Sequence, residues 1–403
     1  MDVTQRLKMQ KSLSRYFHIL KFFILFSLTL PVSCSKKTVD PGPVYNFTIP
    51  EETGDGWTVA SLTEVGIDEG PLTNLMTRLD ETNEHNIHSL LIIKNGKLVF
   101  EKYFTGDKFN LAQYTGETGF DRSDTHNLCS ATKSFTSALI GIAIEQGFIE
   151  SVEQKVFDFF PEHADLLSTN PEKGNLTLNH LLTMTSGLEW DDESTSYFDP
   201  VNDMNRLFNS RNPIRFILAK DFVHSPGAVF EYKNCNTNVL GEIIKKASLM
   251  RLDTFSEDYL FSKLGITDFE WQMISADVVF CSGDLRLRPR DMAKFGYLFL
   301  NGGVWQNARI ISQAWTENSI HRHNELDDYW FDSDGYGYKW WLWNDIDGVA
   351  VNAYAASGWG GQWIIILPDY DTVFVTTGGN YYTEETLSIQ TLLVEYILPA
   401  VAH

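Results

Sequence analysis

LCSATKSFTSALIGIAIEQG, residues 128–147, changes from a polar loop into an apolar helical pattern, and Ser130 stands three residues before Lys133 at the change. Positions i and i+3 of a helix share one face, so the two side chains can meet. Apolar residues such as Phe135 and Leu139 recur at helical spacing and are expected to bury the rest of the helix. The pattern therefore predicts a buried helix with a hydroxyl in its first turn and an amine one turn further along.

Ser130 and Lys133 have the chemistry of a nucleophile and its base. Serine is a weak nucleophile until a neighbouring group removes its proton. A desolvated lysine has a lowered pKa and can serve as that base, while the free N–H groups of a first helical turn stabilise a developing anion. The pattern alone is weak evidence, because a second S-x-x-K occurs at Ser33–Lys36. A helix that merely begins with Ser and contains Lys is the alternative, so companion residues are needed.

The first companion is EYKNCN, residues 231–236, in which Tyr232 and Asn234 form the only Y-x-N of the chain. Alternate residues of a short extended segment point the same way, so a phenol and a carboxamide would face one site. A phenol beside a lysine can carry a proton to and from a leaving group, and the amide can orient both. The alternative is a tyrosine that anchors a turn, with an asparagine satisfying its backbone.

The second companion is YAASGWGGQW, residues 354–363, which immediately precedes an apolar strand. An edge strand of small residues lets a substrate backbone approach and pair with main-chain groups. A backbone N–H of this strand and that of Ser130 could together form an oxyanion hole. The alternative is a glycine-rich loop or β-bulge without a ligand.

The order S-x-x-K, then Y-x-N, then a strand of small residues resembles the serine β-lactamase and penicillin-binding protein superfamily. The likeness is closer to class C β-lactamases and their esterase and D-aminopeptidase relatives, in which Tyr occupies the middle motif. It spans residues 58–400. The resemblance implies an α+β fold, with an antiparallel β-sheet flanked by helices, an all-helical lobe and a site between them. Further stretches that carry it are KVFDFFPE (155–162), HLLTMTSGL (180–188), NVLGEIIKKAS (238–248) and LRPRDMAKFGYLFLNGGVW (287–305).

The resemblance also implies roles for individual residues. Ser130 would be acylated by the substrate, with Lys133 as general base. Tyr232 would carry the proton to the leaving group, and Asn234 would hold the substrate amide or Lys133.

The third motif would fall on Ala356, Ser357 and Gly358, with Ser357, Gly358 and Trp359 contacting substrate. The N–H groups of Ser130 and Trp359 would form the oxyanion hole. Ala356 departs from the family pattern, in which Lys or His is usual and helps to bind a substrate carboxylate. Charge-assisted contacts of this kind are strong, so the departure favours an ester or a small amide without an obligatory carboxylate.

The amino-terminal residues resemble an export signal. Basic residues up to Lys21 are followed by FFILFSLTLPVS, residues 22–33, a run without charge that is too short to span a membrane. The site LPVSC resembles a bacterial lipoprotein cleavage site, so we expect residues 1–33 to be a signal peptide and Cys34 to carry lipid. Pro31 is a departure, because Leu is usual there, and ordinary signal cleavage is the alternative. Both readings predict an exported protein, periplasmic or at the cell surface, with the membrane as a partner if Cys34 is lipidated.

The rest of the chain is predicted to form a tether followed by one domain. Residues 34–56 are rich in Pro, Gly and charge, as a flexible tether would be. The hydrolase domain is expected over 57–403, because strand-like runs lie near both ends of that range and helical patterns lie between them. The sheet would come from 57–115 and 345–403, with the helical lobe within about 150–340.

Composition limits the possible partners. The 403 residues carry a formal net charge of −21, which would repel phosphates, so nucleic acid is not expected as a partner. The four cysteines show neither C-x-x-C nor zinc spacing, and we expect neither a metal site nor a cofactor.

The functional hypothesis is an exported serine hydrolase that acts through a covalent acyl-enzyme on ester or small amide substrates. A class C-like β-lactamase or D-Ala-D-Ala carboxypeptidase is one alternative. A protein that binds penicillins or cell-wall fragments without turnover is another.

Overall fold

The computed structural model describes most of the chain after residue 44. The predicted signal peptide, Cys34 and the first part of the predicted tether lie outside the described residues. From Tyr45 onward the chain forms one compact unit. The described segments are 45–82, 85–110, 113–327, 330–381 and 387–402.

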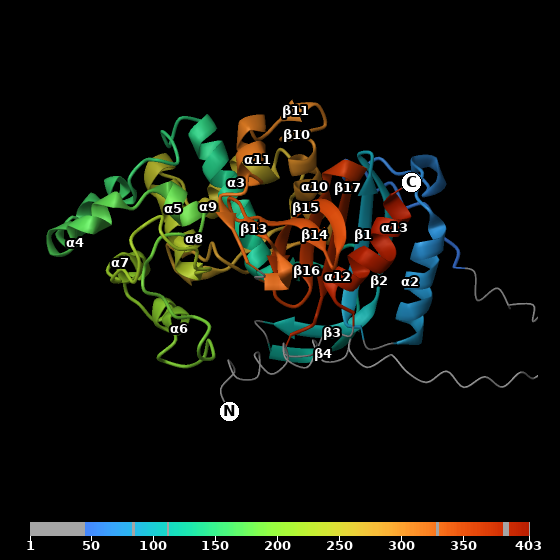
Figure 1. The fold of residues 1–403 in the computed structure, drawn as a ribbon, viewed down its shortest axis with the longest axis horizontal. Helices are drawn as coiled ribbons and strands as arrows, with labels where there is room; N and C mark the ends of the chain where they lie inside the picture. Colours follow the sequence, from blue (N-terminus) through green and yellow to red (C-terminus); the bar gives the residue numbers. More distant parts are fainter. Residues whose placement is uncertain (1–44, 83–84, 111–112, 328–329, 382–386, 403) are drawn as a thin grey trace, which may run out of the picture. The chain divides into compact units, whose positions relative to one another are not determined.

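An eight-stranded antiparallel sheet forms the centre of this unit (Figure 1). Its strands lie in the order β12-β13-β14-β15-β16-β17-β1-β2, so the first strand of the chain pairs with the last one, and β2 pairs with β1 at the edge of the sheet. The α+β fold class predicted from the sequence is confirmed. The strands are β1 (Ile87–Lys94), β2 (Lys97–Tyr103), β12 (Asn324–Glu325), β13 (Gly335–Tyr336), β14 (Trp341–Ile346), β15 (Val349–Gly358), β16 (Gln362–Leu367) and β17 (Thr372–Gly378).

Both faces of the sheet are buried, which explains why its central strands carry apolar residues on both faces. Strand β1 reads IHSLLIIK and is buried along its whole length. Leu91 and Ile93 belong to the hydrophobic cluster that includes α10 (Pro289–Leu300), whereas Leu90 and Ile92 belong to the cluster that includes α2 (Glu69–Glu81). Successive side chains of a strand point to opposite faces, so each strand serves two cores.

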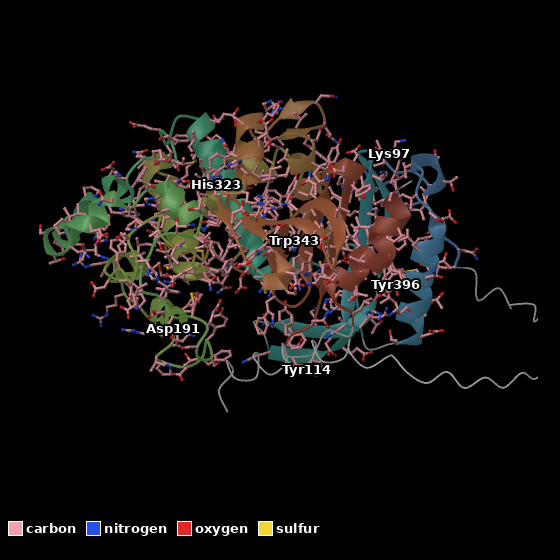
Figure 2. The ribbon with its side chains drawn as sticks, in the orientation of Figure 1. Lys97, Tyr114, Asp191, His323, Trp343 and Tyr396 are labelled. Carbon is pink, nitrogen blue, oxygen red and sulfur yellow. The ribbon has the colours of Figure 1, made fainter. Side chains whose placement is uncertain are left out.

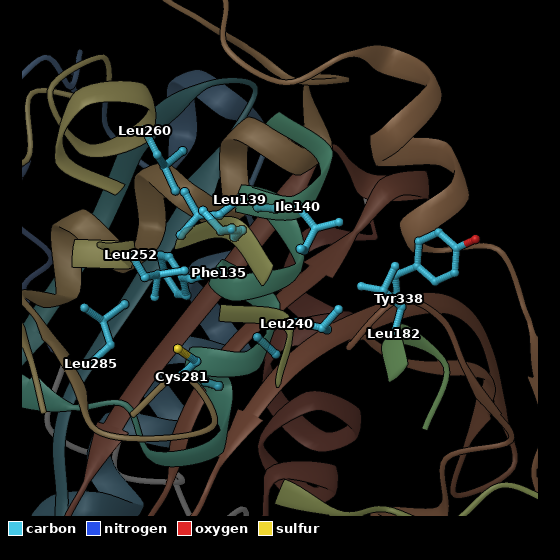
Figure 3. Packing of buried hydrophobic residues seen from close by; sticks show 14 of the residues in the cluster. Phe135, Leu139, Ile140, Leu182, Leu240, Leu252, Leu260, Cys281, Leu285 and Tyr338 are labelled. Carbon is cyan, nitrogen blue, oxygen red and sulfur yellow. The ribbon is translucent and has the colours of Figure 1, made fainter. Parts of the chain in front are cut away.

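A helical region lies beside the sheet and is built around α3 (Thr132–Glu145) and α8 (Asn234–Ser248). Figure 3 shows Phe135 and Leu139 of α3 among other buried apolar residues of the same cluster. No helix of the described residues is long and apolar enough to cross a membrane. The other helices are α4 (Asp165–Thr169), α5 (Leu178–Leu182), α6 (Asp203–Phe208), α7 (Pro213–Leu218), α9 (Leu252–Ser256), α11 (Gln313–Ser319), α12 (Ile389–Thr391) and α13 (Leu398–Val401).

Shorter strands form separate two- and three-stranded sheets outside the main one. A separate hairpin of β3 and β4 follows β2, although most of it falls within the range 57–115 predicted for the main sheet. The short strands are β3 (Thr105–Asn110), β4 (Gln113–Gly119), β5 (His126–Asn127), β6 (Glu270–Trp271), β7 (Met273–Ser275), β8 (Val278–Val279), β9 (Leu285–Leu287), β10 (Val304–Trp305) and β11 (Ala308–Arg309).

Two predicted boundaries differ from those in the structure. Residues 45–56, predicted as tether, pack on the domain because Phe47 contacts Phe100 and the buried Arg290 forms an ion pair with Asp55. The main sheet also takes strands from 324–346, most of which was predicted to be helical lobe. Those strands are short and interrupted by turns, so their pairing depends on the neighbouring strand rather than on a local pattern.

Candidate active site

Ser130 lies in a short 3-10 turn, residues Cys129–Ala131, that leads directly into α3. The turn is tied to the chain before it, because Asn127 Oδ1 accepts a hydrogen bond from the Cys129 N–H at 2.8 Å. Cys129 adopts a left-handed φ of 45°, which is uncommon for a residue with a side chain. The turn therefore presents Ser130 half-buried at the start of a helix whose remaining first turns are buried.

Lys133 contacts the predicted nucleophile directly. Its Nζ lies 2.7 Å from Ser130 Oγ and donates a second hydrogen bond of 2.6 Å to the Ser282 carbonyl. The side chain is 1% exposed, and burial lowers the pKa of Lys133 to about 7, although the Asp192 carboxylate opposes the shift. A substantial fraction of the amine is thus neutral near pH 7, the form that can accept the serine proton.

Tyr232 reaches the same point from the segment before α8. The Lys133 ammonium lies 5.0 Å from the centre of its ring, and the ring stacks on Trp341 at 5.3 Å. Burial raises the pKa of Tyr232 well above its usual range, although a hydrogen bond with Ser130 opposes the shift. The phenol is therefore protonated at neutral pH and can donate to an atom bound at Ser130.

Asn234 is the first residue of α8 and lines the site, but its amide is paired with a carboxylate that the sequence patterns did not single out. Asn234 Nδ2 donates to Asp192 Oδ2 at 2.7 Å, and Trp190 Nε1 donates to the same oxygen at 2.7 Å. The predicted support of Lys133 by this amide does not appear among the described hydrogen bonds. Asp192 instead orders the amide and acts on Lys133 through its charge.

The end of β15 brings Ser357 and Gly358 beside the nucleophile. The neighbouring strand β14 begins at Trp341, opposite Ala355, so the last residues of β15 pair only with β16. A Cβ on Gly358 would lie 2.0 Å from the Leu128 carbonyl oxygen. Only glycine allows this close approach of the strand to the Ser130 turn.

Two cavities meet at Ser130. The first has a volume of about 420 Å³ and the second of about 490 Å³. Figure 2 labels Asp191 and Tyr114, which lie in the loop before α6 and in the β3–β4 hairpin, two segments that border the first cavity. The residues common to both cavities are Ser130, Tyr197, Phe198, Asn234 and Trp359. Among the described residues, no group of three or more His, Cys, Asp or Glu side chains could hold a metal ion.

Sequence reasoning missed a second buried lysine near the site. Lys339 is 2% exposed, and its Nζ donates to the Leu181 carbonyl and lies 3.1 Å from Met184 Sδ. Burial lowers the pKa of Lys339 well below its usual range, and the nearby Lys133 lowers it further. Ser134 of α3 donates to the Lys339 carbonyl at 2.7 Å. A single lysine within an aromatic run carries no pattern from which this placement could be found.

Comparison with known proteins gives a family match over most of the chain. The model of the family described as Beta-lactamase matches residues 73–381. The 6-aminohexanoate-dimer hydrolase of Paenarthrobacter ureafaciens is 24% identical over 325 residues, which cover 75% of this chain and 74% of that protein. Protein flp of Staphylococcus aureus strain MW2 is 27% identical over 46% of this chain and 36% of its own length.

Solved structures share the fold at low sequence identity. A putative 6-aminohexanoate-dimer hydrolase from Bacillus anthracis has a TM-score of 0.62 at 23% identity and covers 81% of both chains. A family VIII carboxylesterase has a TM-score of 0.63 at 16% identity, over 82% of this chain and 96% of that one. An octameric penicillin-binding protein homologue from Pyrococcus abyssi has a TM-score of 0.62 at 20% identity, over 82% and 77%.

Proposed function

The chain belongs to the Beta-lactamase family, and from that premise we propose that it hydrolyses esters or small amides through an acyl-enzyme on Ser130. The family makes it a serine hydrolase of the β-lactamase and penicillin-binding protein superfamily. The observation that carries the assignment of the nucleophile is the 2.7 Å contact between Ser130 Oγ and Nζ of the buried Lys133.

The proposed reaction follows from the protonation states of these groups. Neutral Lys133 takes the proton of Ser130 as Oγ attacks the substrate carbonyl. The N–H groups of Ser130 and Trp359 stabilise the oxyanion of the tetrahedral intermediate. Tyr232 passes the proton from Lys133 to the leaving group, and water then attacks the acyl-enzyme with the same groups acting in reverse.

The substrate class rests on the end of β15. Ala356 is 1% exposed and places a methyl group where a family member would carry a cation for a substrate carboxylate. Among similar proteins, one is named for hydrolysis of a 6-aminohexanoate dimer and one structure is a carboxylesterase. Both support esters and small amides over β-lactams and over peptides that end in D-Ala. We also propose that, within the family, this chain is most similar to the class C branch.

The test is hydrolysis of p-nitrophenyl butanoate together with intact-mass analysis after a fluorophosphonate probe. We expect one phosphonyl group per molecule on the wild-type chain and none on Ser130→Ala. Ser137→Ala is a matched control, because its hydroxyl is buried on the same helix without a described partner. Labelling that persists in Ser130→Ala would place the nucleophile elsewhere.

The rival functions are separated by two β-lactam probes. Nitrocefin turnover at about 1–10³ per second would favour a β-lactamase over an esterase. A penicillin adduct that forms on Ser130 and is not released would favour a binding or sensing protein. With Ala356 in place, we expect neither result.

We also propose that the protein is exported and anchored by lipid on Cys34. The support is the uncharged run of residues 22–33 between basic residues and a small-residue cleavage site. The full-length chain should partition into the detergent phase of Triton X-114 after expression in a bacterium, and Cys34→Ala should move it to the aqueous phase. An unprocessed amino terminus on the wild-type protein would contradict the proposal.

A further inference from the structure

Aromatic side chains that line the first cavity belong to two clusters. In the Phe109 cluster, Phe109 of β3 packs against Tyr381 with ring centres 4.8 Å apart, and Tyr381 packs edge-on against Trp359 at 5.2 Å. In the Phe208 cluster, Phe208 at the end of α6 packs edge-on against Phe280 at 5.1 Å. Among the ring contacts of the described residues, none joins the two clusters. The cavity therefore has rings on walls that come from different parts of the chain.

The cavity is large enough for an aromatic ring and the chain that carries it. Its volume is about 420 Å³, whereas a cavity of about 150 Å³ lined by apolar side chains is enough to bind benzene. Ring pairs are most favourable when they are offset-stacked or edge-to-face, with centres about 4.5–7 Å apart. A ligand ring in this cavity can therefore find partners in both clusters.

Part of this aromatic surface is exposed to water in the free protein. Phe208 is 38% exposed, and Phe198, which lines both cavities, is 68% exposed. Exposed apolar side chains that gather at a cleft are typical of ligand-binding grooves. A ligand that covers these rings removes apolar surface from water, which favours an apolar group in this place.

Several polar side chains in the wall of the first cavity pair with the protein itself. Asn127 Nδ2 donates to Asp284 Oδ1 at 2.7 Å, and Asn127 Oδ1 accepts from the Cys129 N–H. Asn234 Nδ2 donates to Asp192. Burial raises the pKa of Asp284, which favours its neutral form. These groups therefore do not require a charged ligand in the cavity.

The position of Tyr232 decides which part of a substrate enters which cavity. Tyr232 lines the second cavity and does not line the first. A general acid must reach the leaving atom, so the leaving group points into the second cavity and the acyl group into the first. Both cavities meet at Ser130, so the acyl carbonyl can lie at the nucleophile while the rest of the acyl group extends among the rings.

We propose that the first cavity binds an aryl group carried by the acyl part of the substrate, with its ring between the Phe109 cluster and the Phe208 cluster. The preferred substrates are then arylalkanoyl esters or amides, in which a short alkyl chain joins the ring to the carbonyl. This inference rests on the proposed function and deepens it by assigning the substrate class.

The experiment compares two p-nitrophenyl esters with the same number of carbon atoms, the 3-phenylpropanoate and the 3-cyclohexylpropanoate. A cavity that is merely apolar favours the cyclohexyl group, which has the larger apolar surface. Contacts between rings favour the phenyl group. We expect kcat/KM to be about 2–10-fold higher for the phenyl ester, the range of an aromatic pair beyond its area burial. For p-nitrophenyl butanoate, which has no ring to bury, kcat/KM should be at least about tenfold below that of the phenyl ester.

Phe208→Leu tests where the ring binds. Leucine keeps an apolar side chain at this partly exposed position and removes one ring, so the fold should survive and the ratio of phenyl to cyclohexyl ester should fall to about one. Circular dichroism checks the fold. Phe148→Leu is the matched control, because Phe148 packs edge-on against Phe255 at 5.9 Å and lines neither cavity. It should leave the ratio unchanged.

Failure of this inference can be distinguished from failure of the proposed function. Equal kcat/KM for the two esters, preference for the cyclohexyl ester, or an unchanged ratio in Phe208→Leu would overturn the assignment while hydrolysis itself stood. If the wild-type protein hydrolyses neither ester faster than Ser130→Ala does, the proposed function fails. Saturation-transfer NMR with 3-phenylpropanamide and 3-cyclohexylpropanamide then tests the cavity without catalysis. Stronger transfer to the phenyl compound that weakens in Phe208→Leu supports the inference, and equal or stronger transfer to the cyclohexyl compound overturns it.

Discussion

Near the starts of α3 and α10, a buried lysine follows a polar residue at the same spacing, with opposite consequences. Lys294 of α10 lies 2.8 Å from Asp291, three residues earlier, and Lys133 of α3 lies 2.7 Å from Ser130, also three residues earlier. Both lysines are 1% exposed. A carboxylate compensates the buried charge of Lys294, whereas Lys133 has only a hydroxyl and a carbonyl as direct partners.

The difference shows how one spacing can serve structure or chemistry. A buried ammonium beside a carboxylate has its charge compensated, and the ion pair fixes the local structure. A buried ammonium beside neutral oxygens gives up its proton easily, as the pKa of about 7 for Lys133 shows. Four predictions test this contrast between the two lysines.

Replacing Lys133 should have the largest effect. In Lys133→Met, kcat/KM for p-nitrophenyl butanoate should fall by about 10²–10⁴-fold, because the general base is lost. The fold should survive, since an apolar side chain of similar length replaces an amine without a direct carboxylate partner. Steady-state kinetics with circular dichroism as a folding check measures both. Wild-type activity in this variant would contradict the role of Lys133.

Replacing Lys294 should have the reverse effect. Lys294→Met leaves Asp291 buried and uncompensated, so the free energy of unfolding should fall by about 3–5 kcal/mol. Activity per folded molecule should remain at the wild-type level, because α10 lies on the sheet and does not line either cavity. Urea denaturation and active-site titration measure the two quantities. Undiminished stability would mean that the ion pair does not contribute as proposed.

The third prediction concerns the pH dependence of activity. The pKa of Lys133 is about 7, and the neutral amine is the base. Below that pH, kcat/KM should fall about tenfold for each pH unit, because the neutral fraction falls by that factor. Above pH 7 it should level off. Initial rates between pH 5 and 9 test this, and a flat profile would exclude a titrating base of this pKa.

The fourth prediction concerns the pH dependence of stability. Folding lowers the pKa of Lys133 from 10.5 to about 7. Between these two values the unfolded chain binds more protons, so the free energy of unfolding should rise with pH, by at most about 1.4 kcal/mol per pH unit. Lys133→Met should lose this contribution. Equal slopes in urea denaturation series of the wild-type protein and the variant would contradict the lowered pKa.

Local patterns were sufficient for part of the fold. Asn95-Gly96, between β1 and β2, is a strong local signal for a hairpin turn, and both residues adopt the positive φ that the turn requires. The helices α3, α8 and α10 follow from their apolar periodicity. The pairing of β1 with β17 joins segments almost three hundred residues apart, and the sequence predicted it only as strands at both ends of the chain.

The candidate site likewise combines residues that a local pattern predicts with residues that it does not. Ser130 and Lys133 lie three residues apart, so helical geometry alone brings them into contact. Tyr232 and Ser357 were singled out from the Y-x-N pattern and from the strand of small residues, and the family resemblance implied their roles. Both lie beside this pair in the structure. Asp192 and Asp284 were not predicted, because each lies in a loop where acidic residues usually face solvent.

From the sequence alone, a hydroxyl and an amine are expected to meet at the start of a buried helix, since the i and i+3 positions share a face whatever surrounds them. The chemical properties of that pair depend on the tertiary structure. The pKa of Lys133 depends on burial beneath neutral oxygens, and the aromatic lining of the first cavity depends on rings contributed by separate segments. Both are set by packing between segments far apart in the chain, which no local pattern records.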